Sequence, residues 1–78
     1  MSSKPIKEAH FLQGHILEVI SGNGSIVKLN MTPYLSTIRF GLLKDEAIWK
    51  TGVTDGISIR WPGVAEISYE EIMQRAFW

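Results

Sequence analysis

Two histidines, His10 and His15, are the residues of this sequence best suited to chemistry. Imidazole side chains can bind a metal ion or act as a general base near neutral pH. No carboxylate stands at a spacing from both histidines that is typical of a metal site, and the two fall on different predicted strands. We therefore expect exposed or half-buried strand residues, and the sequence predicts no catalytic residue, no bound metal and no cofactor.

A second candidate group is the acidic cluster of Glu66, Glu70 and Glu71. Paired carboxylates can exchange protons with a substrate when burial separates their pKa values. Here Glu71 is expected to cap a helix that begins near Ser68, and Glu70 favours the same helix N-terminus electrostatically. An enzyme that uses His15 or this cluster is therefore the least favoured of our hypotheses, and we expect a protein that is not an enzyme.

The basic residues Lys28 and Arg60 are expected to point outward from a sheet. Cations on an exposed face can contact phosphate groups, which makes a nucleic-acid-binding or autoregulatory domain the alternative function. The simpler interpretation is ordinary solubilising charge. The glycines at 22 and 24 precede a strand rather than a helix, so they do not form a phosphate-binding loop.

Aromatic residues are the most informative set, because three tryptophans are many for so short a chain. Trp49 and Trp61 are predicted to form a cross-strand pair in the core. Phe77 and Trp78 end the sequence, and large exposed aromatics are favoured anchors at interfaces. Trp78 either packs on its own sheet or contacts a partner or second copy. The predicted partner contacts are thus Phe77, Trp78, Lys28 and Arg60.

The elements that position these residues begin with a β-hairpin. An Asn-Gly pair, the strongest short-range hairpin signal, separates two apolar segments at 15–20 and 25–31. A two-residue turn would pair Val19 with a lysine, whereas a three-residue loop ending at Gly24 pairs Val19 with Val27. The second register also pairs two leucines and places His15 opposite Met31. We favour it, because a slip of one residue exchanges the two faces of a strand.

The same reasoning predicts a second hairpin around Asp55-Gly56. A loop over residues 54–56 pairs Val53 with Ile57, Thr51 with Ile59 and Trp49 with Trp61. One face would then carry Trp49, Val53, Ile57, Ile59 and Trp61.

The remaining segments complete an α+β fold. The sequence predicts a first strand over 6–12, single helical turns within 32–36 and 42–48, a short edge strand over 64–67 and a C-terminal helix from Ser68. Ser68 and Glu71 have capping-box spacing, and Glu71 precedes Arg75 by one helical turn. The expected fold is a small, mostly antiparallel sheet of two hairpins with that helix. Residues 1–5 are expected to be flexible, and residues 6–78 to form a single domain.

Composition narrows the function classes. The 78 residues include no cysteine, which excludes a disulfide scaffold and thiolate metal sites. Eight basic residues balance eight acidic ones, so the chain lacks the charge expected of a general nucleic-acid binder. The apolar runs fall far short of the ~20 residues that span a bilayer, and residues 1–5 lack a signal-peptide core. A cytoplasmic location is therefore expected.

From about Ile6 to Ile72 the chain resembles a bacterial family of domains of unknown function, the family numbered 2442. The resemblance rests on these segments, in this order: Gly22-Asn23-Gly24, Leu29-Asn30-Met31-Thr32-Pro33-Tyr34-Leu35, Phe40, Leu43-Lys44-Asp45, Trp49, Ile57-Ser58-Ile59-Arg60-Trp61-Pro62 and Glu66-Ile67. The tryptophan-proline step is the most specific part. The chain departs from the family where Gly63-Val64 follows Pro62, and where Ser68 replaces a common proline.

The resemblance implies a small α+β fold with a curved antiparallel sheet, and it implies no enzyme chemistry. Such domains are often encoded beside another small protein, in pairs that look like toxin–antitoxin modules. The leading hypothesis is accordingly a non-enzymatic protein-interaction module, the antitoxin-like or accessory half of a two-protein complex. Its expected partner is a small protein encoded nearby, with a homodimer as a further option and no membrane association.

Overall fold

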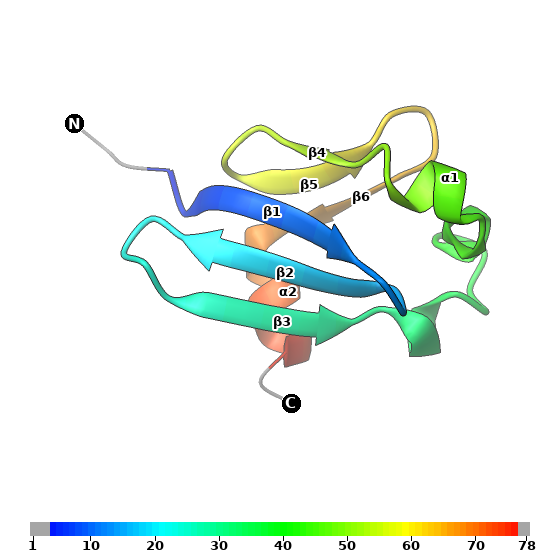
Figure 1. The fold of residues 1–78 in the computed structure, drawn as a ribbon, viewed down its shortest axis with the longest axis horizontal. Helices are drawn as coiled ribbons and strands as arrows, with labels where there is room; N and C mark the ends of the chain where they lie inside the picture. Colours follow the sequence, from blue (N-terminus) through cyan, green and yellow to red (C-terminus); the bar gives the residue numbers. More distant parts are fainter. Residues whose placement is uncertain (1–3, 77–78) are drawn as a thin grey trace.

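The structure, a computed structural model, describes residues 4–76 as two three-stranded antiparallel sheets with short helices (Figure 1). Sheet A has the strand order β1 (Ile6–Leu12), β2 (Ile16–Ser21) and β3 (Ile26–Asn30). Sheet B has the order β4 (Val53–Thr54), β5 (Ser58–Trp61) and β6 (Ala65–Ser68). The predicted α+β class is confirmed, and the predicted edge strand after Pro62 is β6.

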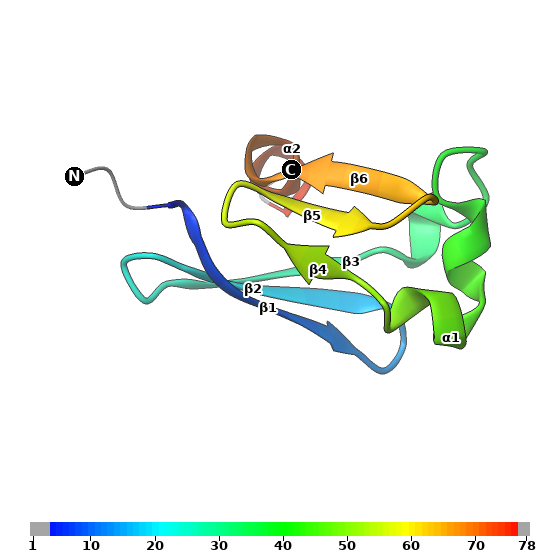
Figure 2. The ribbon, with the colours of Figure 1, turned by 90° about the horizontal axis from the view of Figure 1, so that it is seen from above.

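Helical segments join and cover the two sheets. They are the 3₁₀ turns η1 (Thr32–Tyr34) and η2 (Gly41–Lys44), the short helix α1 (Glu46–Trp49) and the C-terminal helix α2 (Tyr69–Ala76). Asp45 caps α1 by accepting a hydrogen bond of 2.9 Å from the amide of Ala47, as the sequence predicted. Figure 2 shows the sheets as separate layers, with α1 at the end where β1 stops.

The first hairpin has the predicted register. Val19 pairs with Val27 and Leu17 with Leu29, so both strands direct apolar side chains into the core. The Ser21 amide donates to the Ser25 carbonyl at 2.8 Å, and Gly24 has a φ of 90°, the left-handed conformation that the three-residue loop requires.

The predicted register of the second hairpin is wrong. Val53 pairs with Arg60 and Thr54 with Ile59, so Val53 and Ile57 are exposed instead of sharing a core face with the tryptophans. Trp49 lies in α1 and not in a strand, and it is therefore not a cross-strand partner of Trp61. The two indole rings nevertheless stack, with centroids 5.6 Å apart.

Local hydrogen bonds explain the difference. The Asp55 carboxylate accepts from the amides of Ile57 and Ser58, both at 2.9 Å. The Thr54 hydroxyl donates to the Ser58 carbonyl at 2.8 Å and closes a wider loop. These side-chain bonds compete with the strand ladder. On the other side, the Thr51 amide continues the turns of α1 by donating to the Ile48 carbonyl, so Thr51 is not free to pair with Ile59.

The first described residues connect loops of the two sheets. The Pro5 carbonyl accepts a hydrogen bond of 3.0 Å from the Gly22 amide, and the Lys4 ammonium donates to the Asp55 carbonyl at 2.9 Å. The Ile6 amide donates to the Gly56 carbonyl at 2.9 Å. β1 of sheet A therefore starts beside the β4–β5 loop of sheet B.

The hydrophobic core fills the space between the sheets and α2. Its buried members are Ile6, Leu17, Val19, Val27, Leu29, Met31, Leu35, Phe40, Leu43, Trp49, Ile59, Trp61, Ile67 and Ile72. Helix α2 packs against β3 and β6 and directs Tyr69, Ile72, Met73 and Ala76 toward this core.

The N-terminus of α2 forms half of the predicted capping box. The Ser68 hydroxyl accepts from the Glu71 amide at 3.1 Å, as expected. The Glu71 carboxylate does not reach back to Ser68, because it binds the guanidinium groups of Arg39 and Arg75.

Candidate interaction surface

Strand β3 forms an edge of sheet A, and its main-chain groups alternate between β2 and the outside. The hydrogen bonds that flank the ladder join Ser21 with Ser25 and His15 with Met31. Antiparallel pairs alternate between bonded and non-bonded, so Val27 and Leu29 occupy the bonded positions. The amides and carbonyls of Ile26 and Lys28 consequently point away from β2. No other described residue bonds to them.

The other sheet edges are covered to a greater extent in the described part of the chain. β1 packs beside β4, and the Ile6 amide is bonded to the Gly56 carbonyl. The guanidinium of Arg39 donates to the Glu66 carbonyl on β6. Among the described strands, the edge of β3 is therefore the most open.

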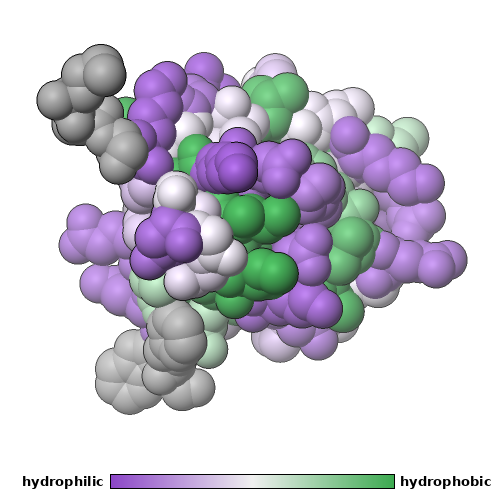
Figure 3. All heavy atoms as spheres, turned by 60° about the vertical axis from the view of Figure 1, so that its left-hand side comes forward, coloured by the Kyte–Doolittle hydropathy of each residue, from purple (hydrophilic) through white to green (hydrophobic). Residues whose placement is uncertain are grey.

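Side chains on the outer face of sheet A form three rows across the strands. The rows are Glu8, Ile20, Ile26; His10, Glu18, Lys28; and Leu12, Ile16, Asn30. The Ile26 side chain lies at the edge with 61% of its surface exposed. Figure 3 brings the β2–β3 hairpin tip forward and shows hydrophobic residues at the surface among hydrophilic ones. The outer face thus presents aliphatic groups on both sides of a charged row.

Lys28 occupies the centre of the open strand. Its ammonium lies 3.8 Å from the Glu18 carboxylate on β2, and its side chain is 61% exposed. A pair this long and this exposed contributes little to stability. The Lys28 charge therefore stays available to a group that approaches the edge.

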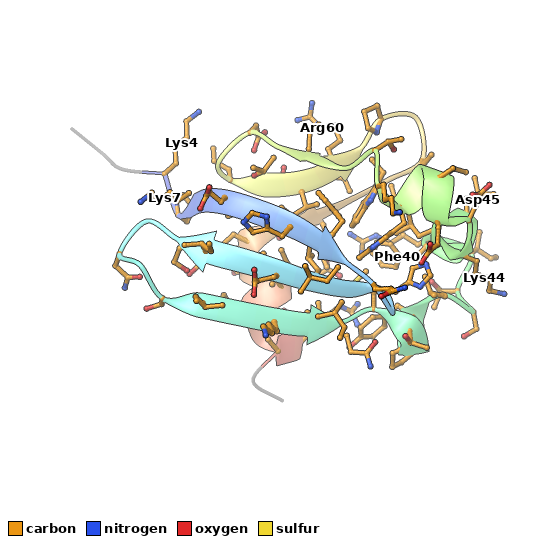
Figure 4. The ribbon with its side chains drawn as sticks, in the orientation of Figure 1. Lys4, Lys7, Phe40, Lys44, Asp45 and Arg60 are labelled. Carbon is orange, nitrogen blue, oxygen red and sulfur yellow. The ribbon has the colours of Figure 1, made fainter. Side chains whose placement is uncertain are left out.

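Arg60 lies elsewhere, on β5 of sheet B. Its guanidinium lies 3.1 Å from the Asp55 carboxylate and 3.6 Å from that of Glu66. In Figure 4, Arg60 stands at the β4–β5 side of the molecule, well away from β3. The structure does not bring Lys28 and Arg60 together, and each has a carboxylate beside it.

Asp55, in the loop between β4 and β5, connects Arg60 to that loop. The amides of Ile57 and Ser58, with the Arg60 charge nearby, hold the pKa of the Asp55 carboxyl below its ordinary value of 3.8. The negative charge of Asp55 therefore lies 3.1 Å from the Arg60 guanidinium.

Two arginines, Arg39 and Arg75, bind the carboxylate of Glu71, and we call these three residues the Glu71 clamp. The sequence predicted only one of the two contacts. The predicted bond to Arg75 is present at 3.0 Å, one helical turn along α2. Arg39, from the loop after η1, forms a two-pronged pair with the same carboxylate, at 2.7 and 2.9 Å. The bond to Arg39 lowers the pKa of Glu71 from its ordinary 4.5. Arg39 stands 32 residues away in sequence, and no local pattern could have revealed this contact.

Two open grooves flank this clamp, and Ser68 and Glu71 line both of them. One has a volume of about 570 Å³, and its wall is completed by Tyr34, Glu70, Gln74 and Arg75. The other has about 550 Å³ and is completed by Arg39, Asp55, Ile57, Ser58 and Glu66. Two of the three carboxylates predicted as an acidic cluster are engaged here in separate contacts, since Glu66 accepts from the Ser58 hydroxyl and Glu71 binds the two arginines.

The two histidines have different environments. His10 is exposed on β1 opposite Glu18. His15 lies in the β1–β2 turn rather than in a strand, with a φ of 58°. Its Nε2 lies 2.6 Å from the Leu43 carbonyl, so this nitrogen carries the hydrogen and donates it. Among residues 4–76, no three metal-binding side chains gather into a group.

Phe77 and Trp78, predicted as partner contacts, lie outside the described residues. Within residues 4–76, no helix has the length and hydropathy needed to cross a membrane. Comparison of the chain with protein-family models, curated proteins and solved structures found no match. The resemblance to family 2442 therefore stays a prediction.

Proposed function

We propose that this chain is a non-enzymatic protein-interaction module of the bacterial cytoplasm, the antitoxin-like or accessory half of a two-protein complex. The observation that carries the proposal is the open edge of β3, where the main-chain groups of Ile26 and Lys28 have no partner among the described residues. Extended segments of other proteins add to such edges as further strands. The family resemblance supports a small protein encoded nearby as the partner.

A strand added to β3 would continue sheet A. Its main chain would bond to the outward amides and carbonyls, and its side chains would cover the exposed part of Ile26. Full burial of an isoleucine side chain contributes about 1.5 to 3 kcal/mol. Since 61% of the Ile26 surface is still exposed, more than half of that contribution is left for a partner to supply.

The test is a tagged pull-down from the native host that compares the Lys28→Pro and Lys28→Ala variants. Proline removes the outward amide and is tolerated on edge strands when that amide faces solvent. Alanine removes the same charge but keeps the amide. We expect the wild type to retain a small protein in stoichiometric amount. Lys28→Ala, which lacks only the charge, should retain clearly more of it than Lys28→Pro, which should lose it. Circular dichroism and thermal unfolding should show that Lys28→Pro is folded.

Equal retention by folded Lys28→Pro would contradict docking at this edge, and the absence of any retained protein would contradict the proposal itself. A parallel pull-down with Trp78→Ala tests whether Trp78, which the sequence predicts as a partner contact, contributes to binding. Weaker retention by that variant would add Trp78 to the interface.

A further inference from the structure

We infer that the strand accepted by β3 carries a carboxylate opposite Lys28 and an aliphatic side chain opposite Ile26, and that it is not β3 of a second copy. This inference rests on the proposed function, and it adds the chemistry of the partner to it. It follows from the position of one charge on the open edge, from the registers that this edge allows and from the exposure of Ile26.

A second copy fits the edge poorly. Only even-numbered residues of β3 direct main-chain groups outward, so a two-fold antiparallel pairing must match even positions with even positions. The register that uses all five residues of Ile26–Asn30 places Lys28 directly opposite Lys28 of the other copy. Like charges at directly opposed positions are destabilising. A shift of two residues avoids this, but it leaves only a three-residue overlap of 26–28 or 28–30.

A strand with a carboxylate at the central position removes the repulsion and gains an attraction. Lys28 is the only charged side chain that β3 presents, and its existing contact with Glu18 is 3.8 Å long. Opposite charges on directly opposed residues stabilise strand pairs. The same lysine therefore disfavours self-pairing and favours an acidic partner.

The position of Ile26 sets the rest of the pattern. Both sheets are antiparallel, and in an antiparallel addition the partner chain runs opposite to β3. The residue opposite Ile26 then follows the residue opposite Lys28 by two positions. The partner segment should accordingly read acidic, any residue, aliphatic. Its first and third side chains would lie on the outer face beside Lys28 and Ile26, in the rows that β2 continues with Glu18 and Ile20.

The experiment is a titration of the isotope-labelled chain, followed by amide NMR, with two capped synthetic peptides. One peptide has glutamate followed two positions later by isoleucine within a valine- and threonine-rich strand, and the other has lysine in place of the glutamate. We expect the acidic peptide to shift the amide signals of Ile26, Lys28 and Asn30 and to bind at least about fivefold more tightly, which corresponds to about 1 kcal/mol. Added salt should reduce this difference.

Charge exchange provides the decisive control. The Lys28→Glu chain should prefer the lysine peptide, whereas Lys7→Glu, which changes an exposed lysine on β1 of the same sheet, should keep the wild-type preference. Equal affinities for the two peptides would overturn the inference, and so would failure of both peptides to shift the β3 amides. Self-association of the wild type through β3, seen as concentration-dependent shifts of the same amides, would assign the edge to a second copy instead. In each of these cases, the pull-down with Lys28→Pro still decides the proposed function by itself.

Discussion

The indole Nε1 of Trp61 donates a hydrogen bond of 3.0 Å to the main-chain carbonyl of Trp49, and both residues are buried. The indole of Trp49 in turn donates to the carbonyl of Leu12 at 3.1 Å. These two hydrogen bonds connect β5 to the end of α1, and α1 to the end of β1. It connects segments that no strand ladder joins.

Replacing Trp61 with phenylalanine should therefore destabilise the fold through more than lost volume. The Trp49 carbonyl would stay buried without its donor, which costs about 1 to 3 kcal/mol. Chemical denaturation measures the change in the free energy of unfolding. The matched variant Trp49→Phe, which frees the less buried Leu12 carbonyl, should cost less. An equal or larger loss of unfolding free energy in Trp49→Phe would show that the buried bond from Trp61 to the Trp49 carbonyl is not the more important of the two.

Gly52 lies against the core aromatics, and its replacement with alanine should be costly. A Cβ atom at this position would approach the ring of Phe11, so the ring must move. Overpacking of this kind costs about 1 to 3 kcal/mol, which thermal unfolding would detect. Gly41→Ala is the control, because the nearest atom to its Cβ would lie at 3.7 Å. The smaller side chain of Phe11→Leu should recover part of the loss in Gly52→Ala.

Two substitutions at His15 distinguish the energetic cost of its left-handed backbone conformation from the contribution of its side-chain hydrogen bond. Both His15→Gly and His15→Ala lose the bond to the Leu43 carbonyl, but only alanine must adopt the left-handed φ of 58° with a Cβ. We expect alanine to destabilise the chain by about 1 kcal/mol more than glycine. Urea denaturation of the two variants gives this difference directly. Identical values would show that the turn does not hold its conformation in solution.

The Glu71 clamp predicts how stability depends on pH. Because Arg39 lowers the folded-state pKa of Glu71, the carboxylate stabilises the fold above its unfolded-state value of about 4.5. This stabilisation should disappear as the pH falls from 4.5 through the lower folded-state pKa. Solvent screens the pair, so we expect about 0.5 to 1 kcal/mol. The free energy of unfolding, measured against pH, should show a smaller acid-dependent change in Glu71→Gln than in the wild type.

The sequence predicted the first hairpin because its apolar residues alternate on both strands and allow one register only. It failed for the second hairpin because Asp55 and Thr54 bond to nearby amides and carbonyls and widen the loop. Trp49 was misplaced for a related reason, since the cap at Asp45 starts a helix that continues through this tryptophan. In both errors, local hydrogen bonds outweighed the alternation of apolar residues.

The candidate surface was predictable only in part. The outward position of Lys28 follows from the hairpin register, and so does its place opposite Glu18. That β3 ends its sheet depends on the order of all the strands, which no local pattern reveals. The hydrogen bond from Arg39 to the Glu66 carbonyl of β6 likewise joins residues that are far apart in the sequence.

The uneven cover of the sheet edges limits the stoichiometry of any complex formed by strand addition. A chain with two open edges can bind a neighbour on each side, and repetition of that contact produces an open-ended fibre. Within residues 4–76, β1 lies beside β4 and the Glu66 carbonyl of β6 accepts from Arg39, so β3 has the most accessible edge. If a partner strand binds to β3, the partial cover of the β1 and β6 edges disfavours a second addition, and we expect a closed one-to-one complex rather than a fibre.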